Sequence, residues 1–236
     1  MSGLPYALCD TATMLRRDVR HSQRNLMMTL SGVGTPIVML VLFVYFFGGT
    51  MGAGLGGGVH GAYINFVAPG ILIMTVCSGC ATTAVNLVMD MSEGVIARFR
   101  TMAISRTSVL TGQVLGSLIR TMISVVLVIG VALLIGFRPI AGPVAWIAVL
   151  GVMALFTLAV TWMGVVFGLV GKTPAGANSL SLIFLLLSFT SSAFVPTDSM
   201  TGVVRWYAEY QPVTPVINTL RGLLLGTPIG DSAALA

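Results

Sequence analysis

Long apolar runs separated by short polar segments make up most of the chain. Each run is about 17–27 residues long, the length an α-helix needs to cross a hydrocarbon core of roughly 30 Å. Lipid offers no partner to backbone polar groups, and a helix satisfies them within its own segment. The pattern therefore predicts an all-α integral membrane protein with about five transmembrane helices, at residues 30–47, 63–89, 121–137, 144–170 and 179–195.

Two further segments are predicted to lie along the membrane surface. In residues 8–28, apolar positions recur near helical spacing beside a stripe of arginines, which is typical of an amphipathic helix in the headgroup layer. The stripe consists of Arg16, Arg17, Arg20 and Arg24. The same arginines also fit a simple charged flank that orients the first span, and both interpretations can hold together. Residues 196–226 contain no apolar run long enough to cross, so we expect an outer re-entrant or interfacial helical segment.

Composition agrees with a lipid-covered exterior. Of 236 residues, 56% are hydrophobic and 8% are charged, whereas a soluble domain carries about 25% charged residues. The net charge of +5 lies mostly in two short segments between apolar runs. We interpret it as topology and headgroup contact and expect no nucleic-acid partner, because that would need a soluble basic face. The three cysteines indicate no disulfide framework.

The distribution of Lys and Arg predicts the orientation. With the amino end in the cytoplasm, the inner segments carry nine of these residues and the outer segments carry three. The inner set is Arg16, Arg17, Arg20, Arg24, Arg98, Arg100, Arg106, Arg120 and Lys172, and the outer set is Arg138, Arg205 and Arg221. This positive-inside bias predicts a multi-pass protein of the cell membrane with a cytoplasmic N-terminus. Five spans would put the carboxyl end outside.

Two short motifs could suggest chemistry, and each has a simpler interpretation. Gly171-Lys172-Thr173 resembles the end of a phosphate-binding loop, but the glycine required five positions earlier is Val166. We interpret it as a helix-ending turn. Cys77 and Cys80 share one helix face, yet a single pair without further ligands favours close helix packing over metal or redox chemistry. The glycine pairs Gly112/Gly116 and Gly164/Gly168 also predict close helix contacts.

Catalysis within the membrane is not expected. The only histidines, His21 and His60, lie outside the predicted spans, and no zinc-protease motif is present. The spans hold essentially no ionisable residues, which argues against an ion-coupled pump. Their hydrogen-bonding groups are few, namely Asn65, Thr82, Thr83, Asn86, Asn178 and several serines. Such a lining would suit an amphipathic or apolar cargo, although interhelical contacts are the more ordinary role of these residues.

Residues 90–106 are the most informative segment. Asp90, Glu93 and Gly94 precede a short amphipathic helix on the predicted cytoplasmic side. The apolar face of that helix holds Val95, Ile96, Phe99 and Met102, and Arg98 and Arg100 point elsewhere. A helix of this kind can dock into a groove of a soluble partner. The alternative is an ordinary charged loop that lies on the membrane.

In the order of these features the chain resembles the membrane subunit of an ABC-2 type transporter, of the daunorubicin/doxorubicin-resistance permease kind. The interfacial helix at 8–28 matches the helix before the family's first span. Asp90-x-x-Glu93-Gly94, continuing to Met102, matches the acidic pattern and coupling helix between spans two and three. The family's outer segment is matched by Pro196, Pro212, Pro215, Arg221 and Gly222.

The resemblance implies a division of labour. Two membrane subunits, identical or different, would pair in the lipid, and cytosolic P-loop ATPases would bind their coupling helices and hold the ATP and Mg²⁺. This chain would then need no cofactor and would export an amphipathic or hydrophobic compound, whether drug, lipid or glycan. The family usually has six spans, so five implies either a truncated chain or a companion subunit that compensates. A non-transporting, lipid-organising scaffold remains an alternative, and a lipid-modifying enzyme lacks a catalytic cluster.

Overall fold

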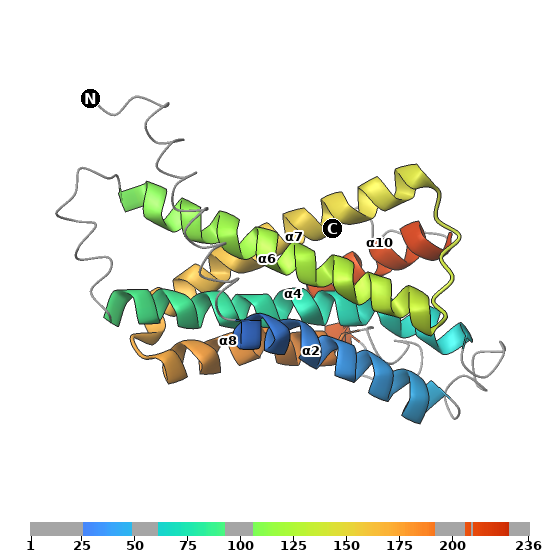
Figure 1. The fold of residues 1–236 in the computed structure, drawn as a ribbon, viewed down its shortest axis with the longest axis horizontal. Helices are drawn as coiled ribbons and strands as arrows, with labels where there is room; N and C mark the ends of the chain where they lie inside the picture. The colour runs from blue at the N-terminus through green and yellow to red at the C-terminus, as the bar shows by residue number, and fades with distance from the viewer. Residues whose placement is uncertain (1–25, 49–60, 93–105, 192–205, 209, 227–236) are drawn as a thin grey trace.

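The computed structural model describes residues 26–48, 61–92, 106–191, 206–208 and 210–226. These residues are almost entirely helical and include no strand, which confirms the all-α membrane fold. The helices are α2 (Leu26–Leu42), its π-helical continuation η1 (Phe43–Phe47), α4 (Gly61–Ser92), α6 (Arg106–Ile135), α7 (Pro143–Gly171), α8 (Pro174–Phe189) and α10 (Val213–Leu225). They form one elongated bundle (Figure 1).

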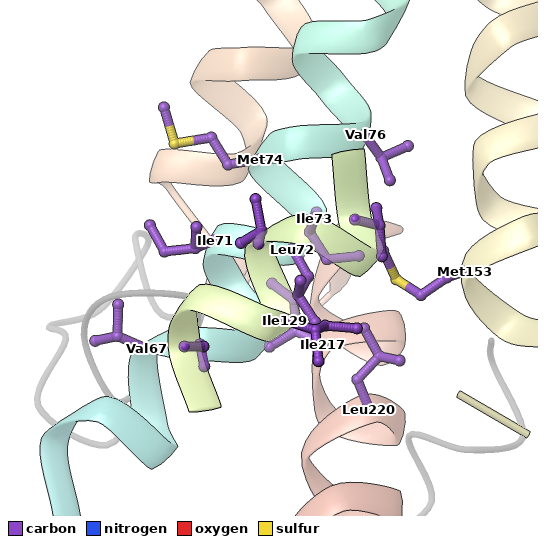
Figure 2. Packing of buried hydrophobic residues seen from close by; sticks show 14 of the residues in the cluster. Val67, Ile71, Leu72, Ile73, Met74, Val76, Ile129, Met153, Ile217 and Leu220 are labelled. Carbon is purple, nitrogen blue, oxygen red and sulfur yellow. The ribbon is translucent and has the colours of Figure 1, made fainter. Parts of the chain in front are cut away.

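Helix α4 is the centre of this bundle. It contacts each of the other described helices and lies between them in Figure 1. Every residue from Ile71 to Cys77 is buried, so this helix has no free face along that stretch. Figure 2 shows the surrounding cluster, in which Leu72 and Ile73 of α4 meet side chains of α6, α7 and α10. The labelled partners from these helices are Ile129, Met153, Ile217 and Leu220.

Contacts along α4 fix the direction of its neighbours. Helix α6 runs antiparallel to α4, because Gly79 faces Thr121 and Thr83 faces Ser117. Helix α7 runs parallel to α4, because Cys80 meets Gly164 and Ala84 meets Gly168. The bundle therefore has two distinct ends. We call the end with Ser92, Arg106 and the α7–α8 turn the coupling end, and the end with the α6–α7 turn and α10 the α10 end.

Among the described residues, three helices are long and apolar enough to cross a membrane, at Tyr63–Ser92, Leu110–Ile135 and Pro143–Gly171. Shorter apolar helices cover Val33–Phe46, Pro174–Phe189 and Val213–Leu225. The bounds of two helices differ clearly from the expected ones. Helix α6 begins at Arg106, fifteen residues before the expected span, since the polar residues ahead of it are helical too. Helix α8 begins at Pro174, because Thr173 caps it, and it ends at Phe189 rather than continuing to 195.

The outer surfaces of the bundle are apolar. On α6 and α7 the exposed positions include Leu134, which is 88% exposed, and Val144, which is 78% exposed. Others on these helices are Ile123, Val126, Leu127, Ile147, Leu155, Val166, Leu169 and Val170. Water would disfavour so large an exposed apolar area in a soluble protein. Lipid contact accounts for it, because a membrane-spanning helix turns its most apolar side chains to the acyl chains.

Candidate functional site

Most residues of the expected coupling site lie outside the described part of the chain. These are Glu93, Gly94, Val95, Arg98, Phe99, Arg100 and Met102. The same holds for the predicted interfacial arginines Arg16, Arg17, Arg20 and Arg24, and for Pro196 of the outer segment. Asp90 is described, half-buried in the last turns of α4. These assignments therefore stay predictions.

The described helices nevertheless place the ends of the expected coupling segment. Helix α4 ends at Ser92 and α6 begins at Arg106, and both termini belong to the coupling end of the bundle (Figure 1). The α7–α8 turn lies at this end as well, and its Lys172 is exposed. The coupling end therefore brings together the end of α4, the start of α6 and the α7–α8 turn.

The Gly171-Lys172-Thr173 turn is confirmed as a helix-ending turn. Lys172 ends α7 in the left-handed region with a φ of 52°. Thr173 then caps α8, its Oγ1 accepting a hydrogen bond from the Gly176 amide at 3.1 Å, and Pro174 occupies the first helical turn. A Cβ on Gly176 would lie 2.5 Å from the Gly171 carbonyl oxygen, so glycine is required for this tight reversal.

The α4–α7 seam confirms the close packing predicted for Cys80 and for the Gly164/Gly168 pair. A Cβ on Gly164 would lie 2.9 Å from the Cys80 carbonyl oxygen and 3.1 Å from its Sγ. One turn further on, a Cβ on Gly168 would lie 2.9 Å from the Ala84 carbonyl oxygen. Small residues spaced four apart on both helices let their backbones touch. Among the described residues no three His, Cys, Asp or Glu side chains gather as metal ligands would.

Helix α4 makes two further seams of small and polar side chains. Toward α6, the hydroxyls of Thr83 and Ser117 are hydrogen-bonded to each other, and Gly79 faces Thr121. Toward α8, Ser188 Oγ donates to Cys77 Sγ at 3.2 Å. Hydrogen bonds of this kind between membrane helices contribute about 0.6 kcal/mol each on average. These groups act as interhelical contacts in the bundle core.

The central position of α4 was not predicted from the sequence. A signal was present, because α4 has a lower mean hydropathy than α6 or α7 although it is the most buried of the three. In lipid, the helix without a lipid-facing side can carry small and polar residues, and its neighbours must be the more apolar ones. The run from Thr75 to Ala84 has this composition.

At the α10 end, Arg221 contacts the first turns of α4. Its Nη2 donates to the Phe66 carbonyl oxygen at 3.2 Å, and its Cζ lies 4.1 Å from the centroid of the Phe66 ring. Burial lowers the pKa of Arg221 to about 10, which leaves the guanidinium charged at neutral pH. Of the other outer-segment residues, Pro215 and Gly222 are buried and Pro212 is exposed. The resemblance to the family's outer segment pointed to Arg221, but nothing in the sequence indicated Phe66 as its partner.

A bundle of long apolar helices with lipid-facing exteriors and small, polar seams inside defines a multi-pass membrane protein. The family model for ABC-2 type transporters matches residues 10–225. The chain therefore belongs to the ABC-2 type transporter family, and it is a membrane protein of the permease class.

Individual relatives agree with this family. The daunorubicin resistance ABC transporter permease protein DrrB1 of Streptomyces coeruleorubidus is 27% identical over 222 residues, which are 94% of this chain and 77% of that protein. The probable doxorubicin resistance ABC transporter permease protein DrrC of Mycobacterium tuberculosis is 24% identical over 170 residues, 72% of this chain and 62% of that protein. ABC transporter G family member 20 of Dictyostelium discoideum is 24% identical over 176 residues, 72% of this chain and 23% of that protein.

Proposed function

We propose that this chain is the membrane-spanning permease subunit of an ATP-driven exporter. The observation that carries the proposal is the family match over 10–225, on a chain whose described part includes three helices long and apolar enough to cross a membrane. The named relatives in two bacteria are permeases of drug-resistance transporters, which supports outward movement of cargo.

The proposed energy source is a cytosolic P-loop ATPase that binds at the coupling end. Asp90 through Met102 would form the docking element between α4 and α6, with Glu93 and Gly94 at its start. ATP and Mg²⁺ would be held by the ATPase. Movement of the docked element would reach the core directly, because α4 contacts each of the other described helices. The N-terminus and the coupling end would then face the cytoplasm, and the α10 end would face outward.

The proposed cargo is an amphipathic or hydrophobic compound. The polar groups of the described core are hydroxyls, thiols and amides rather than charges, apart from Asp90, Arg120 and Arg221 in partly buried positions. A lining of this kind would bind an apolar body and a few hydrogen-bonding groups, but it would not compensate a strongly charged solute. A second permease subunit, identical or different, would complete the translocation path between the two chains.

Inside-out membrane vesicles test this function. The chain is co-expressed with its neighbouring or co-purifying ATPase, and the fluorescent anthracycline doxorubicin is the first probe, followed by mass spectrometry of the vesicle contents. Export predicts accumulation that needs ATP, that stops with vanadate and that disappears when this chain is omitted. A complex that hydrolyses ATP while no compound accumulates above the chain-free control would contradict the proposal.

A further inference from the structure

Three polar contacts join three separate elements at the α10 end. Arg221 of α10 donates to the Phe66 carbonyl of α4 at 3.2 Å. Asn65 of α4 accepts, through Oδ1, the backbone amide of Arg138 in the α6–α7 turn at 3.3 Å. Ile140 of the same turn donates its amide to the Leu224 carbonyl of α10 at 3.0 Å. The contacts close a ring from α4 to the turn, from the turn to α10, and back to α4.

Two of these contacts supply a backbone group with a partner that its own element does not give. Leu224 lies in the last turn of α10, where carbonyls have no intrahelical donor, and Ile140 fills that place. The turn follows a glycine-ended helix, with Gly136 at a φ of 121° and the Phe137 amide bonded back to the Ala132 carbonyl at 2.9 Å. The amide of Arg138 comes directly after that cap, and it is the Asn65 side chain that accepts from it.

The α4 side of the ring lies beside a proline. Pro69 has no N–H to give to the carbonyl of Asn65 four residues earlier, which weakens the helical ladder in this turn. Arg221 bonds the next carbonyl, that of Phe66, and stacks its guanidinium against the same residue's ring at 4.1 Å. A charged donor plus a cation–π contact in a partly buried place holds more strongly than a neutral hydrogen bond. Arg221 is therefore the strongest of the three links.

We propose that Arg221 is a positioning residue that locks α10 and the α6–α7 turn onto the proline-containing first turns of α4, so that these elements move as one body. This proposal rests on the proposed function, in which the α10 end is the exit side of the path. As a single body, the α10 end would respond as a unit when α4 shifts at its coupling end. The links depend on one another, so loss of Arg221 weakens the two contacts in which it takes no part.

Hydrogen–deuterium exchange of the full chain in lipid nanodiscs tests this dependence. The probes are the amides of Arg138 and Ile140, both donors within the ring but not bonded to Arg221. Arg221→Gln removes the positive charge and the contact with the aromatic ring of Phe66. We expect hydrogen–deuterium exchange at these two amides to become about tenfold faster, equivalent to about 1.4 kcal/mol. Phe66→Leu removes the aromatic ring but leaves the backbone carbonyl that Arg221 bonds. Arg221→Lys keeps the positive charge but lacks the planar guanidinium. Both variants should therefore give smaller increases in the exchange rate.

Control measurements separate a local link from general loosening. Arg138→Gln changes only an exposed side chain and should leave exchange unchanged. Peptides from the α4–α7 seam should also keep their protection in Arg221→Gln. Unchanged exchange at Arg138 and Ile140 in this variant, or an increase confined to α10 or spread over the whole bundle, would overturn the proposal. If Arg221→Gln does not fold, the same exchange measurement is made on Phe66→Leu and Arg221→Lys. Faster exchange at the Arg138 and Ile140 amides then supports the proposal, and unchanged exchange overturns it.

Export by the same variants in vesicles gives a second, separate readout. A positioning role predicts that Arg221→Gln keeps ATP hydrolysis but exports fewer molecules per ATP, with partial recovery in Arg221→Lys. An unchanged ratio of export to hydrolysis in Arg221→Gln would contradict the role in transport. Absence of export by the unmodified chain would count against the proposed function alone, because the exchange experiment still decides whether the ring moves as one body.

Discussion

Replacing Gly164 by alanine tests the α4–α7 seam most sharply. The added Cβ would lie 2.9 Å from the Cys80 carbonyl oxygen, and that atom belongs to a helix backbone that cannot rotate away. The two helices must separate locally or lose contact along the seam. We therefore expect Gly164→Ala to lower the stability of the bundle.

The magnitude follows from two opposing effects. Adding an atom to a packed interior destabilises the fold by about 1–3 kcal/mol. Replacing glycine by alanine within a helix stabilises it by about 1 kcal/mol. Gly151 offers a matched control on the same helix, since it is exposed and a Cβ there would meet nothing within 4 Å. Gly151→Ala should therefore be stabilised by the higher helix propensity of alanine, with no opposing packing cost. The difference between the two variants isolates the packing cost, at about 1–3 kcal/mol.

The assay is thermal unfolding of both variants and the unmodified chain in the same detergent, followed by loss of the monodisperse peak. For a chain of this size each kcal/mol shifts Tm by about 2–4 °C. Gly164→Ala should unfold below Gly151→Ala, and Cys80→Ala should not rescue it because the nearest obstacle is backbone. Equal stabilisation by Gly164→Ala and Gly151→Ala would refute the close seam.

Three further substitutions test other contacts. Gly79→Ala should destabilise the bundle by about 1–3 kcal/mol because its Cβ would lie 2.6 Å from Thr121 Oγ1. Thr121→Ala should relieve this clash. Additive effects of the two substitutions in a double-mutant cycle would contradict the predicted contact. Ser188→Ala removes the donor to Cys77 and should cost about 0.6 kcal/mol in thermal unfolding, whereas the exposed Ser179→Ala should cost nothing measurable. Gly176→Ala should lower Tm clearly, since its Cβ would meet the Gly171 carbonyl, while Gly142→Ala, with open space around it, should not.

The membrane fold could be predicted because its cause is local. A run of apolar residues long enough to cross lipid must be helical, whatever surrounds it. The turn at Lys172 and the packing role of Cys80 and Gly164 were also readable, since motif spacing and residue size limit what they can do. The helix bounds were less accurate. Capping by Thr173 moved the start of α8, and the polar residues before the third span continued its helix.

The partners of each helix could not be predicted, because they depend on contacts far apart in the chain. Nothing near Arg221 in the sequence points to Phe66, 155 positions earlier. The only sequence signal for the central position of α4 is that its mean hydropathy is lower than that of α6 and α7. That difference can be interpreted only once the neighbours of α4 are known. The coupling residues from Glu93 to Met102 lie outside the described residues, so their assignment still depends on the motif alone.

Affinity purification of this chain from native membranes in mild detergent, with quantitative mass spectrometry of its partners, tests the central claim most directly. The permease account predicts a stoichiometric P-loop ATPase that is lost when Glu93 and Gly94 are replaced, and retained with Arg138→Gln at the opposite end of the bundle. Recovery of the folded chain in good yield without an ATPase would contradict the account and favour a lipid-organising scaffold.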